Sequence, residues 1–166
     1  MQLDGLIYTL PKNLKLLIGA FIFVLSIGFF TGLLFVGETS STNPKGIEEQ
    51  YLGNEEDEDA LIMKFKKSEK EMLTLVHTHV LSMSIIFFLT GLILAITKLN
   101  KKLKLCLMIE PFLSVVLTFG GLYFLWKGLL WMKYVVIISG TLMTLSFTLA
   151  ICIIMYQLLI SPQQYN

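Results

Sequence analysis

Long uncharged apolar runs alternate with short charged segments along this chain. Crossing about 30 Å of hydrocarbon takes roughly 20 helical residues. Four runs reach this length, at residues 14–37, 72–97, 105–126 and 134–160. Because lipid offers no hydrogen-bond partner to peptide groups, spans of this kind form helices. The pattern predicts an all-α fold, an integral membrane four-helix bundle in a single domain covering residues 1–166.

The first run also invites comparison with a cleaved signal peptide. Lys12 and Lys15 give it a basic flank, but its apolar stretch of about 22 residues exceeds the 7–15 of a signal sequence. No small-x-small cleavage pattern follows it. We therefore predict a retained first helix.

One sizeable extramembrane loop is predicted, at residues 38–71, and it is acidic. Glu48 and Glu49 precede a run of acidic residues at 55–59. The run lacks the ligand spacing and internal glycine of an EF-hand loop. A solvated acidic face is therefore favoured over a site for a cation or a basic partner.

The end of this loop carries two helical signals. Ser68-x-x-Glu71 matches a capping box directly before an apolar run, which predicts that the second span begins at Glu69. Leu61, Phe65 and Met72 share one helical face with lysines between them. This spacing favours a helix lying at the membrane interface ahead of the span.

The basic residues bear on orientation and on partners. All thirteen are lysines, and arginine is the usual residue for bidentate phosphate recognition, so no nucleic-acid partner is expected. The short connection 98–104 is densely basic. With Lys12 and Lys15 it predicts that both termini are cytoplasmic, in a bacterial inner membrane. Lysines also occur on the opposite side, so their number alone leaves the orientation open.

Small residues recur on one face of several spans. Such faces let helices pack closely in lipid, and here they predict contacts within the chain or with a second copy. They are Gly28 and Gly32 in the first span, Ser114 and Thr118 in line with Glu110 and followed by Gly120-Gly121 in the third, and Gly140, Thr144, Thr148 and Cys152 in the fourth. Cys106 and Cys152 both lie inside apolar runs and are interpreted as small buried hydrophobic residues rather than a disulfide.

The two histidines of the chain lie inside the second span, in the sequence His77-Thr78-His79. Ionisable residues in a span usually face the bundle interior or a cavity. Residues two apart on a helix differ by about 200° in direction, so the two rings cannot ligate one iron. The face of His79 continues through Met83 and is the more polar one, which favours His79 as the interior residue.

This segment resembles the haem-ligand helix of the haem-copper oxidase superfamily and of related four-span membrane proteins. The resemblance covers about Leu75 to Gly91 and implies haem b ligation by His77 or His79, with Met83 beside the cofactor. Either histidine is also a candidate ligand for another metal or a proton relay. The competing interpretation is a hydrogen bond from each ring to a hydroxyl or a backbone carbonyl.

Glu110-Pro111 is the second place where chemistry is predicted inside a span. An acid near the bilayer centre costs about 2.5–3.5 kcal/mol, so Glu110 is expected to be neutral, paired or facing water. Pro111 cannot donate a backbone hydrogen bond and leaves a carbonyl near Leu107 without its usual donor. A proton or cation pathway competes with a neutral carboxyl bonded to this backbone or reaching toward the interface.

These observations give three hypotheses about function. The first is a haem b-binding electron-transfer component or accessory subunit of a respiratory membrane complex. The second is a non-catalytic docking or assembly subunit, with other membrane subunits or a second copy as partners. The third is a proton- or ion-coupled carrier using Glu110. The sequence contains no nucleophile triad, phosphate-binding glycine loop or HExxH helix, so an independent enzyme is not expected.

Overall fold

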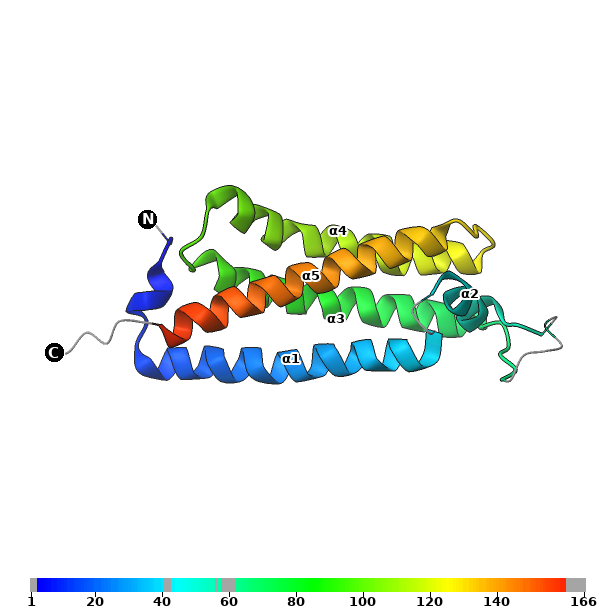
Figure 1. Cartoon of the computed structure of the whole chain (residues 1–166), viewed down its shortest axis with the longest axis horizontal. Helices are drawn as coiled ribbons and strands as arrows, with labels where there is room; N and C mark the ends of the chain where they lie inside the picture. The colour runs from blue at the N-terminus through cyan, green and yellow to red at the C-terminus, as the bar shows by residue number, and fades with distance from the viewer. Residues whose placement is uncertain (1–2, 41–42, 56, 58–61, 161–166) are drawn as a thin grey trace.

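A computed structural model describes residues 3–40, 43–55, 57 and 62–160, and within these residues the chain is helical with no strand. A short 3₁₀ helix, η1 (Leu6–Thr9), precedes five α-helices (Figure 1). The α-helices are α1 (Lys12–Ser40), α2 (Pro44–Leu52), α3 (Glu69–Ala95), α4 (Lys101–Trp126) and α5 (Met132–Leu159).

Four of these helices, α1, α3, α4 and α5, are long and apolar enough to cross a membrane. They run side by side, and α1 begins where α5 ends (Figure 1). The predicted all-α membrane four-helix bundle is therefore confirmed. The helices begin a few residues before the predicted spans, because first turns with polar residues continue the helix ahead of the apolar run; α3 and α5 end one or two residues before their predicted ends.

The start of α3 follows the predicted capping box. The hydroxyl of Ser68 accepts a hydrogen bond from the Glu71 backbone N–H at 3.3 Å, and the Glu71 carboxylate accepts one from the Ser68 N–H at 2.8 Å. Two of the N–H groups that a helix start leaves unbonded are satisfied in this way. The helix accordingly begins at Glu69, as expected.

The prediction of an interfacial helix ahead of α3 is wrong at the described residues. Phe65 lies in a non-helical segment, and Met72 is fully buried inside α3; Leu61 lies outside the described residues. The helix of this loop is α2, which begins because Asn43 accepts a bond from the Gly46 N–H at 2.7 Å with Pro44 in the first turn.

Part of the acidic loop is paired rather than simply solvated. The carboxylate of Glu48 lies 2.6 Å from the ammonium of Lys133 at the start of α5, and Lys45 pairs with Asp57 at 3.2 Å. The acidic residues at 56, 58 and 59 lie outside the described residues. Nearby, the Trp126 indole N–H donates to the Lys67 carbonyl at 2.7 Å. The loop is thus fastened to one end of the bundle.

The bundle is organised around the contact between α4 and α5. A Cβ on Gly121 would lie only 3.0 Å from Val136 Cγ2, so this glycine lets the two helices approach closely. The hydroxyls of Thr118 and Ser139 meet at 2.7 Å across the same contact. The predicted small-residue packing of the fourth span is confirmed at Gly140, whose Cβ would lie 3.9 Å from Thr118 Cγ2.

Helix α1 is attached much more loosely. It is held through a few buried side chains, Ile18, Ile22 and Phe29, of which Phe29 stacks on Phe147 of α5 with ring centroids 4.0 Å apart. The small-residue face at Gly28 and Gly32 is exposed, and no atom lies within 4 Å of a Cβ added at either glycine. A contact for this face within the described chain is therefore ruled out, because α5 meets α1 on the Phe29 side.

The interpretation of the two cysteines as buried residues is also wrong. Cys106 and Cys152 are both free thiols and both exposed on the apolar surface of the bundle. A surface that faces lipid favours apolar side chains as much as a core does. A cysteine in an apolar run can therefore lie either in the core of the bundle or on its lipid-facing surface.

Gly120 and Gly121 offer a matched test of the contact between α4 and α5. We expect Gly121→Val to lower stability by about 1–3 kcal/mol relative to Gly120→Val, because added methyl groups overpack against Val136. Both changes alter helix propensity alike, and Gly120 has open space beside it. Thermal unfolding in detergent measures the difference, and equal stabilities would contradict the proposed close approach.

Candidate functional site: an intramembrane histidine and a buried carboxyl

His79 lies about two and a half turns into α3 and is half-buried against α4. Its Nδ1 lies 2.8 Å from the Leu75 carbonyl oxygen. A carbonyl only accepts, so Nδ1 carries the hydrogen and donates it. The ring stacks on Phe119 of α4, with centroids 4.8 Å apart and planes 28° from parallel. These two contacts fix the orientation of the imidazole.

His77 and Met83 do not join His79 in one site. His77 is exposed, and Met83 is half-buried against the core of the bundle. The two imidazoles point away from each other, as their spacing predicts. Among the described residues, no group of three or more His, Cys, Asp or Glu side chains is placed to hold a metal ion.

An open groove runs along α3 beside His79. It has a volume of about 460 Å³ and is lined by Lys70, Glu71, Thr74, Leu75, Thr78 and His79. Ligand pockets are usually about 300–1,000 Å³ and mostly apolar with a few polar groups. The groove has a volume in this range, but it is an open surface groove, and Leu75 is the one hydrophobic residue in a lining of mostly exposed polar side chains. His79 lies at one end of it, and Lys70 and Glu71 lie at the other.

The imidazole of His79 leaves one ring nitrogen available to a ligand. In a neutral imidazole that donates from Nδ1, the lone pair lies on Nε2, and no described residue forms a hydrogen bond to that nitrogen. Metal-bound histidines commonly donate the N–H of the nitrogen that does not bind the metal to a backbone carbonyl. The other histidine, His77, is exposed and points to a different side of α3, so it is not placed to be a second axial ligand on the same iron.

Glu110 occupies a different part of the bundle. One carboxyl oxygen, Oε1, accepts a short hydrogen bond from the Ser114 hydroxyl one turn later. The other oxygen, Oε2, is fully buried and has no hydrogen-bond partner among the described residues. Pro111, beside it, is buried within α4, which continues through it. The bond to Ser114 replaces the backbone bond that the sequence suggested.

Sequence reasoning missed several residues of these sites. Ser139 was not singled out, although its hydroxyl meets Thr118 between α4 and α5. Phe119 and Lys70 were not connected with His79, because no spacing within one helix reveals a contact with another helix or the length of a groove. The separation of Glu110 from the histidines was expected from the antiparallel spans, and no described hydrogen bond or ion pair joins them.

Comparison with known protein families identifies a match over most of the chain. A family model described as a transmembrane helical domain, Aq_1264_TM, matches residues 41–165. The match includes α2 through α5 and leaves α1 outside. No curated protein matches the chain, and no solved structure matches it.

The unpartnered carboxyl oxygen gives a prediction about stability. A buried polar atom without a partner costs about 1–3 kcal/mol. We expect Glu110→Met to raise the free energy of unfolding by about this amount, because methionine fills a similar volume without the polar atoms. Ser114→Ala, which removes the one hydrogen bond of the carboxyl, should lower it. Denaturation in mixed micelles measures both, and a destabilised Glu110→Met protein would show that the carboxyl has a stabilising partner.

Proposed function

This chain belongs to the Aq_1264_TM transmembrane helical domain family, and we propose that in the membrane it is a haem b-binding subunit with His79 as the axial ligand. The observation that carries the proposal is the fixed orientation of the His79 ring. Its Nδ1 is engaged by the Leu75 carbonyl, which leaves the Nε2 lone pair for iron. Imidazole is a standard axial ligand of haem iron.

The groove along α3 supports the same proposal. Lys70 precedes His79 by nine residues, which is about 13–14 Å along a helix. A haem ligated at His79 would direct its carboxylates toward the water side of the membrane, where Lys70 supplies a positive charge. Thr74, Leu75 and Thr78 would then lie along the porphyrin.

When bound, the haem supplies reversible one-electron oxidation and reduction at its iron. The residues of the chain hold and orient this group: Leu75 fixes the imidazole, Phe119 packs against its face, and Lys70 offsets the carboxylate charge. These features suit an electron-transfer component within a larger respiratory membrane complex, where a second subunit covers the exposed side of α3.

A second function, docking or assembly without a cofactor, is favoured by the state of α1. This helix exposes large apolar side chains along most of its length, among them Leu17, Phe23 and Phe35 at 64%, 63% and 69% exposure. A helix of 29 residues with only four buried ones leaves most of its surface for lipid or for another membrane subunit. The third hypothesis, a carrier that uses Glu110 to couple transport to a proton or an ion, stays a prediction.

The two histidines provide the test of the haem proposal, because one serves as the control for the other. We expect gently purified protein, expressed with ample haem, to show a Soret band that is lost in His79→Ala and kept in His77→Ala. Lys70→Gln should weaken haem retention several-fold, because one favourable charge near the carboxylates is removed.

Circular dichroism would establish that each variant keeps its helices. A band that survives in His79→Ala, or a wild-type protein without any band, would overturn the haem proposal and leave the docking function.

A further inference from the structure

At the end of the bundle opposite the His79 groove, side chains hydrogen-bond the connection between α3 and α4 to the end of α5. The amide of Gln157 is buried, donates from Nε2 to the Lys98 carbonyl at 2.9 Å, and accepts from the Lys98 N–H at 2.8 Å. These two bonds clamp the connection between α3 and α4 onto the end of α5. Lys104 adds to the clamp by donating to the carbonyls of Thr97 and Ala95 at 2.6 and 3.2 Å.

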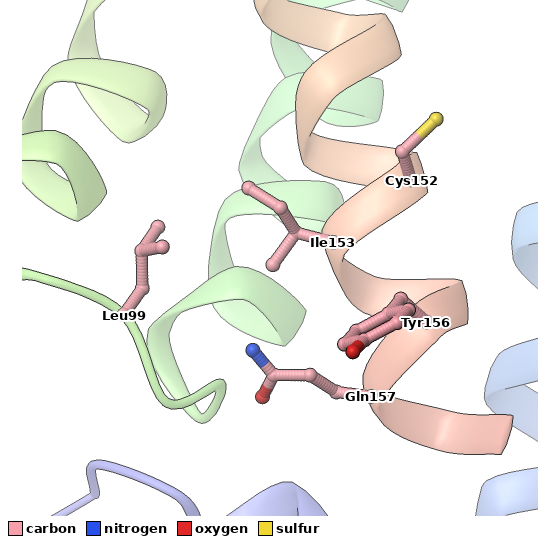
Figure 2. Close-up of a pocket in the computed structure, with 5 residues that line it drawn as sticks. All are labelled: Leu99, Cys152, Ile153, Tyr156 and Gln157. Atoms are coloured by element: carbon pink, nitrogen blue, oxygen red, sulfur yellow. The ribbon is translucent and has the colours of Figure 1, made fainter. Parts of the chain in front are cut away.

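The clamp leaves an apolar groove beside α5. It has a volume of about 430 Å³ and is lined by Leu99, Cys152, Ile153, Tyr156 and Gln157 (Figure 2). Leu99 on the connection lies across the groove from Ile153 on α5 (Figure 2). Tyr156 is 64% exposed, so the groove is open toward the lipid. Of the polar groups in the lining, the Gln157 amide is already bonded to Lys98, and the Tyr156 hydroxyl and the Cys152 thiol are the others.

Positive charge is concentrated in the connection that carries Leu99, one of the residues lining this groove. Lys98, Lys101 and Lys102 surround Leu99 in the sequence and are exposed. No described acidic residue forms an ion pair with these three lysines. The described acid nearby, Asp4, lies 2.6 Å from the Lys104 ammonium, whose hydrogen bond holds the pKa of this carboxyl below its usual value. Asp4 also interacts electrostatically with Lys101. The lysines at 98, 101, 102 and 104 thus have one described carboxylate beside them and keep a net positive charge.

We propose that this end of the bundle is a binding site for an anionic phospholipid. One acyl chain would lie in the groove between Leu99 and Ile153, and the phosphate would lie on Lys98, Lys101 and Lys102. Basic groups at the membrane surface beside a groove between spans are the usual features of such a site. A soluble anion would use the lysines alone, whereas the apolar lining favours a ligand that also carries a hydrocarbon chain.

Native mass spectrometry tests the proposal on the full chain. The protein is released from nanodiscs that hold equal amounts of phosphatidylglycerol and phosphatidylcholine with matched acyl chains. We expect wild-type protein to retain phosphatidylglycerol with a preference of roughly tenfold, because several lysines act on one headgroup. The triple variant Lys98→Gln, Lys101→Gln, Lys102→Gln should lose this preference.

The control is a triple variant with the same loss of charge at the other end, Lys45→Gln, Lys66→Gln, Lys127→Gln, which should keep the preference. Because Lys45 and Lys127 form ion pairs there, circular dichroism checks that this variant keeps its helices. Equal losses in the two triple variants would overturn the proposal, since they would reflect overall charge. An excess of glycerol phosphate, the headgroup without chains, should not displace the lipid. Displacement would show a site for soluble anions and would also overturn the proposal.

The groove itself is tested by filling it. Ile153→Trp, and separately Leu99→Trp from the other wall, should lower phosphatidylglycerol retention several-fold with all lysines present. Two variants are used so that a folding defect in one leaves the other as the test. Unchanged retention in a variant with an intact helical spectrum would overturn the proposed acyl-chain site.

Discussion

Every polar group of this bundle must find its hydrogen-bond partner within the protein, because the surrounding hydrocarbon supplies none. Within the helices, hydroxyls such as that of Thr148 donate to a carbonyl one turn earlier, at 2.7 Å. Between helices, Thr118 meets Ser139, and the Gln157 amide closes on both polar atoms of the Lys98 backbone. Against this background Oε2 of Glu110 stands out, as a buried side-chain oxygen without a partner among the described residues.

Features that are set by the residues of one segment could be predicted from the sequence. Features that are set by contacts between two segments far apart in the sequence could not. The spans and the Ser68 capping box follow from local composition and spacing, and both are confirmed. The place of the loop helix was predicted wrongly, because Gly53 packs against the backbone of residues 64–66 and holds that segment in a non-helical form. In the candidate site, the sequence predicted His79 as the interior histidine because its helix face is the more polar one. The contact of His79 with Phe119 could not be predicted, because it depends on how α3 and α4 pack.

The two ends of the bundle differ in charge and in construction. At one end, the loop carrying α2 brings acids to lysines, as in the pair of Glu48 and Lys133. At the other end, Gln157 and Lys104 hold a short connection whose exposed lysines form no described ion pair. The candidate haem groove lies near the first end and the candidate lipid groove at the second. Function at either groove is therefore separable from function at the other.

The hydrogen bond from the Trp126 indole to the Lys67 carbonyl has a spectroscopic consequence. The chain has two tryptophans: Trp126 is 8% exposed and fastened to the loop, whereas Trp131 is 57% exposed at the turn before α5. Intrinsic fluorescence of the protein thus contains one indole whose surroundings change whenever the loop lifts from the bundle. The native chain carries its own optical reporter of loop docking, without any attached dye.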